Sequence, residues 1–102
     1  MKLIDLDAQF VVNDDESIWA DRTGLTLEQA QGVRFNDPIQ GGGVVCWFRN
    51  RGVPDDAIPG PGRWTPSGTG LHDLTLEPSV DLSCGGKYPN AWHGWVRNGE
   101  VT

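Results

Sequence analysis

The clearest hydrophobic pattern in the chain is the uninterrupted apolar run Val44-Val45-Cys46-Trp47-Phe48. Such a run between Gly43 and Arg49 predicts a strand that is buried on both faces. Cys46 inside it is expected to pack as a small buried hydrophobe. Weaker strand patterns occupy Leu3–Val12, Leu71–Leu76, Ser79–Ser83 and Ala91–Asn98.

The end of the chain predicts a hairpin. Asn98-Gly99 follows the strand Ala91–Asn98 and precedes Glu100-Val101-Thr102, which favours a type I′ turn and a short return strand. Because side chains alternate along a strand, Trp92 is expected to lie on the face opposite His93 and Trp95.

One helix signal is present, at Thr26–Gly32. Thr26 can cap the first turn, Gln29 stands at the capping-box position and Gly32 can end the helix. The segment from Asn50 to Gly70 is rich in Pro and Gly, so we expect a long loop, pinned by the side chains of Ile58 and Trp64. The predicted fold is α+β: a small antiparallel sheet of about four to six strands, one short α-helix and long Gly/Pro-rich loops.

Length and composition fit one domain over residues 1–102, with 37% hydrophobic residues and five Trp. No apolar run reaches the roughly 20 residues of a membrane span, and carboxylates interrupt the first ten residues where a signal peptide would be apolar. The two cysteines, Cys46 and Cys84, do not make a disulfide framework. We therefore expect a cytoplasmic monomer with reduced thiols and no membrane partner.

Charge is unevenly distributed along the chain. Residues 1–37 hold eight carboxylates against three bases, a net charge of −5, whereas the whole chain has a net charge of −6. A clustered negative field repels nucleic acid and attracts basic protein surfaces, including surfaces that hold nucleic acid. The distribution argues against direct binding of DNA or RNA and indicates a basic partner.

Candidate chemistry is sparse. Cys84 and His93, with Cys46 or Asp37, could supply metal ligands, but the close ligand pairs typical of structural zinc sites are missing. Cys84 beside His93 could also serve as a nucleophile, although no charge pattern that lowers a thiol pKa accompanies it. Gly41-Gly42-Gly43 precedes a predicted strand, whereas a phosphate-binding loop opens a helix. We assign no catalytic residue, no metal ligand and no cofactor.

A resemblance to known proteins covers somewhat more than half of the chain. The segments that carry it are Cys46-Trp47-Phe48, Arg51–Asp56, Pro59–Gly70 and Trp92–Gly99. They resemble a group of small bacteriophage and prophage proteins. The resemblance implies a zinc-stapled ribbon with a Cys-Pro-x-Cys pair before the central strand. This sequence departs from that pattern, because Asp37 and Gln40 replace the two thiols and only Cys84 and His93 match the second half.

A short, acidic phage-type chain is also similar to anti-CRISPR inhibitors, including small inhibitors of type I-C effector complexes. This resemblance implies a non-enzymatic protein that binds a Cascade subunit in the host cytoplasm and blocks access of target DNA. The alternative is a small structural or accessory phage domain, with or without a zinc staple. Acidic side chains can imitate the charge spacing of a nucleic-acid backbone. The residues expected to meet a basic surface are Asp5, Asp7, Asp14, Asp15, Glu16, Asp21, Asp55 and Asp56.

Overall fold

A computed structural model describes residues 1–14, 17–21, 24–57, 62–82 and 91–102, and of residues 14 and 17–21 it gives the backbone alone. This part of the chain forms ten short strands and two 3₁₀ helices. In chain order these are η1 (Leu3–Leu6), β1 (Gln9–Asp14), β2 (Ser17–Asp21), β3 (Gly32–Asn36), β4 (Gly43–Trp47), β5 (Thr65–Ser67), η2 (Leu71–Asp73), β6 (Thr75–Glu77), β7 (Val80–Asp81), β8 (His93–Gly94), β9 (Val96–Arg97) and β10 (Glu100–Val101).

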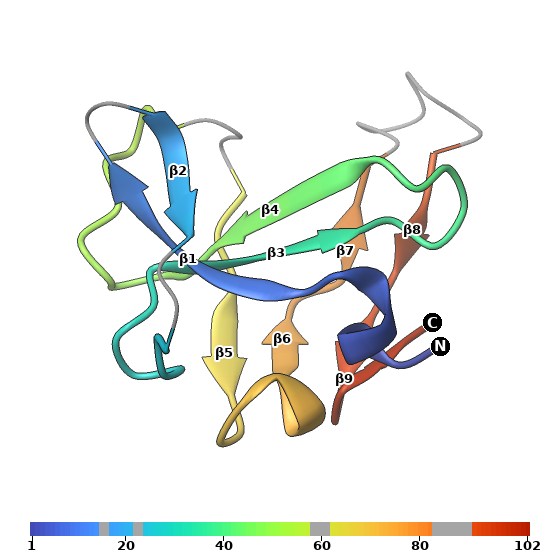
Figure 1. The fold of residues 1–102 in the computed structure, drawn as a ribbon. Coiled ribbons are helices and arrows are strands. Elements are labelled where there is room, and N and C mark those ends of the chain that lie inside the picture. Colours follow the sequence, from blue (N-terminus) through green and yellow to red (C-terminus); the bar gives the residue numbers. More distant parts are fainter. Residues whose placement is uncertain (15–16, 22–23, 58–61, 83–90) are drawn as a thin grey trace.

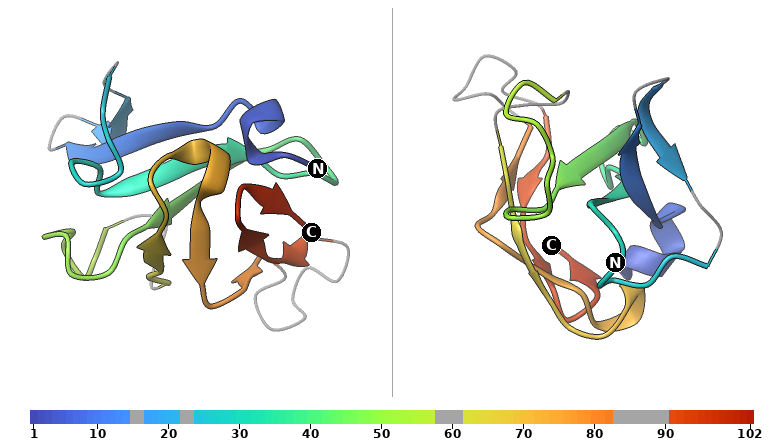
Figure 2. Two further views of the ribbon diagram at one scale, coloured as in Figure 1. Left: turned by 90° about the horizontal axis from the view of Figure 1, so that it is seen from below. Right: turned by 90° about the vertical axis from the view of Figure 1, so that its left-hand side faces the viewer.

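The strands form two layers. One layer is a four-stranded sheet in the order β2-β1-β3-β4, and the other holds the pairs β5-β6, β7-β8 and β9-β10, all antiparallel (Figures 1 and 2). The prediction of a small antiparallel β structure is confirmed, although the described strands are shorter and more numerous than expected. No helix in the described residues has the length and hydropathy that a membrane crossing requires.

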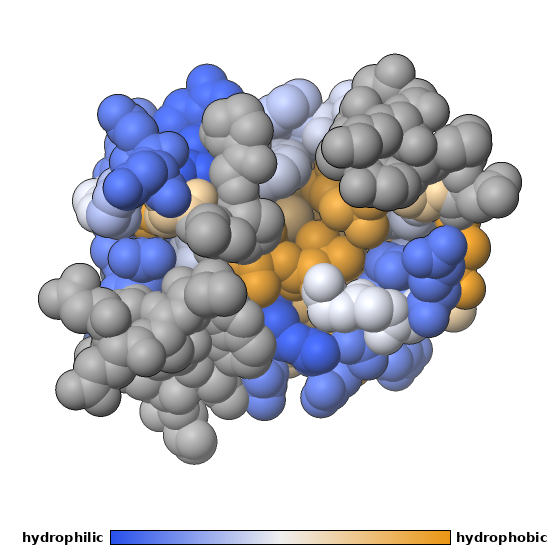
Figure 3. Space-filling model, turned by 90° about the horizontal axis from the view of Figure 1, so that it is seen from above, coloured by the Kyte–Doolittle hydropathy of each residue, from blue (hydrophilic) through white to orange (hydrophobic). Residues whose placement is uncertain are grey.

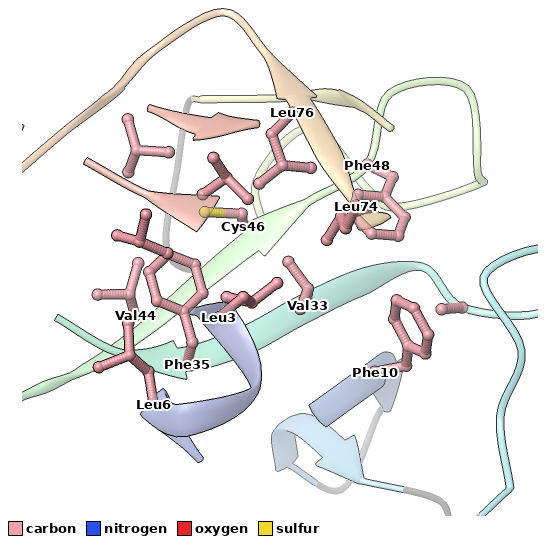
Figure 4. Close-up of a cluster of buried hydrophobic side chains, with 14 of the residues drawn as sticks. Leu3, Leu6, Phe10, Val33, Phe35, Val44, Cys46, Phe48, Leu74 and Leu76 are labelled. Carbon is pink, nitrogen blue, oxygen red and sulfur yellow. The ribbon is translucent and has the colours of Figure 1, made fainter. Parts of the chain in front are cut away.

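The main hydrophobic core lies between the two layers, and Figure 4 shows its side chains pointing toward one another. The four-stranded sheet contributes Val33, Phe35 and Cys46, and the layer of short strands contributes Leu74 and Leu76. Burying apolar side chains from both layers provides the main stabilisation, at roughly 25 cal/mol for each Å² removed from water.

Strand β4 is buried on both faces, as its continuous apolar run predicts. Cys46 and Phe48 face the main core, while Trp47 packs on the opposite face in a second cluster with Val11 and Ala57. The thiol of Cys46 is fully buried, and this burial raises its pKa. Cys46 is therefore a packed hydrophobe, as expected, and is protonated at neutral pH.

The predicted α-helix at Thr26–Gly32 is wrong. Its capping box is present, because the Thr26 N–H donates to Gln29 Oε1 at 3.1 Å and the Gln29 N–H donates to Thr26 Oγ1 at 3.3 Å. The segment makes one turn, closed by the Ala30 N–H on the Thr26 carbonyl oxygen. Gln31 then donates its N–H to Val11 O, and Gly32 begins β3. Pairing with the sheet outweighs local helix propensity.

Other strand boundaries also differ from the prediction. Leu3–Val12 is divided into η1 and β1, because Asp7 adopts a left-handed conformation (φ 54°) that turns the chain. Leu71–Leu76 begins as η2 and only its end joins β6. Strands β2 and β3 were not predicted, and β5 lies inside the segment expected to be a loop.

The turn of the terminal hairpin matches its prediction, although the predicted strand Ala91–Asn98 is divided into β8 and β9. Asn98 and Gly99 both have positive φ, of 50° and 74°, as a type I′ turn requires, and Arg97 pairs with Glu100. Trp92 is buried and packs edge-to-face on Phe35 with ring centroids 5.8 Å apart, while His93 is exposed on the other face.

Trp64 pins the long loop to the core, as predicted. Its indole Nε1 donates to the carbonyl oxygen of Ser79 at 3.3 Å, and its ring packs against the main core. Its backbone forms a bridge with Phe48, which joins the loop to the end of β4. Ile58, the other residue expected to pin this loop, lies outside the described residues.

Candidate docking surface

The acidic residues predicted to meet a partner do not form one continuous group. Asp5 lies in η1 and Asp7 directly after it, before β1 begins. Asp14 and Asp21 lie at opposite ends of the β1–β2 ladder, since Asp14 pairs with Ser17 and Asp21 pairs with Val11. Asp15 and Glu16 lie outside the described residues. A six-residue strand at about 3.3 Å per residue separates Asp7 from Asp14 by roughly 20 Å.

Asp7 already has an internal partner. Its carboxylate Oδ2 accepts a hydrogen bond from Arg34 Nη1 at 3.0 Å, and its carbonyl oxygen accepts another from the same nitrogen at 2.8 Å. The guanidinium also binds Asn36 Oδ1 at 2.7 Å. Arg34 therefore neutralises Asp7, so of these two neighbouring carboxylates Asp5 contributes more to an external field.

Asp55 and Asp56 are exposed on a turn of the long loop. The Ala57 N–H donates to Pro54 O at 3.0 Å and closes the turn. Arg63 Nη2 donates to the same carbonyl oxygen at 2.7 Å, which leaves the two carboxylates pointing to solvent without an ion pair among the described residues. Ala57 is buried beside Val11, so the turn is anchored against β1.

The side chain of Gln31 links this loop to the β1–β2 hairpin. Its Oε1 accepts the N–H of Asn13 at 2.8 Å, and its Nε2 donates to the carbonyl oxygen of Arg51 at 2.9 Å. One carboxamide thus holds the residue before Asp14 close to the loop that leads to Asp55 and Asp56.

The loop and the hairpin lie at the same end of the molecule. Both occupy the left-hand end in Figure 1 and in the left panel of Figure 2. Figure 3 shows mainly hydrophilic atoms where described residues are visible at that end. We call Asp14, Asp55 and Asp56 the acidic end, with Asp14 placed by its backbone.

Arg51 is the second residue that builds the acidic end. Its Nη1 donates to the carbonyl oxygens of Leu27 at 2.9 Å and Ala30 at 2.8 Å, and its guanidinium lies over the ring of Phe48. Sequence reasoning assigned no role to Arg51 or Gln31. The sequence signal that could have indicated a role for Arg51 is its place in the segment Arg51-Gly52-Val53-Pro54-Asp55-Asp56. No local sequence pattern indicates a role for Gln31.

No family model, curated protein or solved structure matches the chain.

Asp37 and Cys46, two of the residues considered as metal ligands, have other roles in the structure. The Asp37 carboxylate is buried and accepts the N–H groups of Ile39, Gln40 and Gly42, so that its pKa is lowered although burial acts to raise it. Cys46 is a protonated core residue, as shown above. Cys84 lies outside the described residues. Within the described part of the chain, no three His, Cys, Asp or Glu side chains are grouped so that they could bind a metal ion.

His93 forms the one described contact that resembles a base beside a nucleophile. Its Nε2 lies 3.1 Å from Ser79 Oγ, and both side chains are at the surface. Activation of Cys84 by His93, the nucleophile hypothesis from sequence, would therefore have to use Nδ1 or break this hydrogen bond. A Ser–His pair needs a third orienting group and oxyanion donors before it can catalyse acyl transfer.

Proposed function

We propose that this chain is a non-enzymatic inhibitor of the anti-CRISPR type, which docks its acidic end on a basic DNA-binding surface of a host type I Cascade complex. The single observation that carries the proposal is the link made by Gln31, which hydrogen-bonds the residue before Asp14 to the loop that leads to Asp55 and Asp56, about 40 residues later. Such an inhibitor acts in the host cytoplasm and does not itself contact nucleic acid.

The physical basis of the proposal is charge complementarity. Exposed carboxylates attract a groove lined with Lys and Arg, speed the encounter and compete with DNA phosphates for the same bases. Asp55 and Asp56 suit this role because their turn is anchored by Ala57 and Arg63 while their side chains remain in solvent. A rigid turn loses little conformational entropy on binding.

The test is charge reversal with a matched control. We expect Asp56→Lys to weaken binding to purified Cascade and Asp55→Lys/Asp56→Lys to weaken it further, by about tenfold or more at low salt. Glu77→Lys makes the same charge change as Asp56→Lys at an exposed position in β6, and should leave affinity nearly unchanged.

Competition with target DNA identifies the docking site. Wild-type protein should displace target DNA from the complex, and the double variant should fail to do so at the same concentration. If the double variant and Glu77→Lys bind and compete equally, the acidic-end proposal is wrong, and a structural or accessory phage domain is the function left to test. Zinc analysis of the purified protein then decides whether that domain is metal-stapled.

A further inference from the structure

The pair Asn98-Gly99 is chemically reactive in any flexible chain. The backbone nitrogen of the residue after an asparagine can attack the side-chain Cγ, and glycine, which has no Cβ, leaves that nitrogen open to the attack. Of the five asparagines in the sequence, Asn98 alone is followed by glycine. Its side chain is exposed, so water reaches it. The pair that forms the terminal turn is therefore also the position at which an unfolded chain deamidates most readily.

Deamidation proceeds in two steps that need only water. A bond forms between the Gly99 nitrogen and Asn98 Cγ, the bond from Cγ to Nδ2 breaks, and ammonia leaves with the proton of the Gly99 amide. The product is a five-membered succinimide ring. Water then opens the ring at either carbonyl and leaves aspartate or isoaspartate in place of Asn98. Isoaspartate continues the main chain through the side-chain carboxyl group, so the backbone becomes one methylene longer.

The native turn holds the reacting atoms apart. Asn98 is in the left-handed region, with φ of 50°, where ψ is about +30 to +60°. Since Cβ and the backbone nitrogen are separate tetrahedral substituents of Cα, Asn98 Cβ is then rotated roughly 150–180° from the Gly99 nitrogen around the Cα–C bond. Ring closure needs these two atoms on the same side of that bond. The dihedral angles of a type I′ turn therefore exclude the succinimide ring.

Hydrogen bonds to two other segments fix this turn. The Gly99 N–H, which is the attacking group, donates to Leu74 O at 2.9 Å, and Gly99 O accepts the N–H of Leu3 at 2.8 Å. The Asn98 N–H donates to Thr75 Oγ1 at 2.9 Å. Gly99 itself is buried. The Gly99 nitrogen can therefore react only after the hairpin separates from β6 and from the N-terminal residues.

We propose that Asn98 is a deamidation site that the fold keeps closed, and that it reacts only when the β9–β10 hairpin opens. Isoaspartate lengthens the backbone of a two-residue turn, so the bonds to Leu3, Leu74 and Thr75 cannot all form again. One opening followed by reaction thus prevents the return of the native hairpin. The site is independent of the proposed function, because the turn is distinct from the acidic end.

Isoaspartate mapping of the full chain tests the closed state. Wild type is incubated at mildly alkaline pH, either folded or unfolded in guanidinium chloride, and the peptide that contains Asn98 is followed by mass spectrometry. We expect conversion in the folded protein to be slower by about a hundredfold or more, because it needs the open hairpin. Equal rates in the two conditions would overturn the proposal.

Thr75→Val and Thr65→Val are a matched pair that tests the hydrogen bonds. Thr75→Val removes the hydroxyl that accepts the Asn98 N–H, so the hairpin opens more often and conversion in the folded protein should rise by about threefold to tenfold. Thr65→Val makes the same change at an exposed position in β5 and should leave the rate unchanged. In guanidinium chloride both variants should react as fast as wild type. Equal rates for the two folded variants also overturn the proposal.

The consequence of the reaction is tested on the modified chain. The isoaspartyl form is separated by chromatography and compared with Asn98→Asp, which has the same charge and an unaltered backbone. Aspartate tolerates the left-handed region, so Asn98→Asp should keep the turn. The isoaspartyl form should melt at a lower temperature than Asn98→Asp. Equal melting temperatures would overturn the inference that isoaspartate prevents the return of the hairpin.

Discussion

Gln31 donates a hydrogen bond from its side-chain amide to the backbone carbonyl oxygen of Arg51 across 2.9 Å. The same side chain accepts the N–H of Asn13, and the backbone of Gln31 bonds to Val11 and Phe48. One residue therefore joins β1, the end of β4 and the long loop at the point from which the acidic end is built.

Gln31→Ala is expected to destabilise the fold by about 1–3 kcal/mol, because it removes the partly buried hydrogen bonds that the side chain makes with the N–H of Asn13 and the C=O of Arg51. Binding to Cascade should weaken as well, since the hairpin and the loop are no longer held together. Urea unfolding and a binding titration measure the two effects. Gln40→Ala removes an exposed carboxamide and should change neither; an equal effect of both variants would contradict the role of Gln31.

Arg51→Lys is expected to lower stability by about 1–2 kcal/mol although it keeps the charge. A lysine cannot reproduce the flat guanidinium that lies over Phe48 and donates to the carbonyl oxygens of Leu27 and Ala30. The control is Arg49→Lys, because the guanidinium of Arg49 makes an exposed hydrogen bond to Arg63 O. Chemical denaturation compares the stability of the two variants. Arg49→Lys should stay within about 0.5 kcal/mol of wild type.

Acid is expected to destabilise the protein through Asp73. Hydrogen bonds from the Thr69 and Gly70 N–H groups lower the pKa of Asp73 from 3.8 to about 2. Because the pKa is lower in the folded state, the ionised form stabilises the fold above about pH 4, and this contribution disappears as the pH falls from 4 to 2. Asp37, whose pKa is also lowered, acts in the same direction.

The measurement is thermal unfolding of wild type and Asp73→Asn across this pH range. The variant should be less stable at neutral pH, and the difference should shrink as the pH falls toward 2. Asp56→Asn, which changes an exposed carboxylate on a turn, should match wild type throughout. A difference between wild type and Asp73→Asn that stays constant with pH would contradict the assignment.

Gly99→Ala is expected to be far more damaging than Gly41→Ala, although both glycines have positive φ, of 74° and 78°. A Cβ at Gly41 meets open space, so only backbone strain of about 1 kcal/mol is added. A Cβ at Gly99 overlaps the carbonyl oxygen of His72, and the cost should exceed about 3 kcal/mol. Comparable melting temperatures for the two variants would contradict this contact.

Local signals predicted the parts of the fold that depend on neighbouring residues. The turn at Asn98-Gly99 follows from residues that tolerate positive φ, and the burial of Cys46 follows from its apolar run. The capping bonds of Thr26 and Gln29 were also predictable. The helix that these bonds predict does not form, because the backbone N–H of Gln31 bonds to Val11 in the sheet. That outcome depends on residues distant in the sequence and not on local helix propensity.

The missed strand β3 did have a signal. Val33 and Phe35 are buried while Arg34 and Asn36 are half-buried, which is the alternation of a sheet with one covered face. The candidate site was harder to predict, because sequence placed Asp5 and Asp7 with Asp14 in one acidic segment. The structure separates Asp5 and Asp7 from Asp14 along β1. Gln31 links the residue before Asp14 to Arg51, at the start of the loop that holds Asp55, and no local pattern encodes this contact.

Residues near the two ends of the chain are hydrogen-bonded to each other. Val101 N–H donates to Met1 O at 2.7 Å, and Leu3 N–H donates to Gly99 O at 2.8 Å, while Leu3 itself is fully buried. The backbone partners of Met1 and Leu3 therefore become available only after β10 has been synthesised. Contacts of such long sequence separation form slowly, so this part of the core is expected to be completed late in folding, when residues 1–3 and β10 can meet.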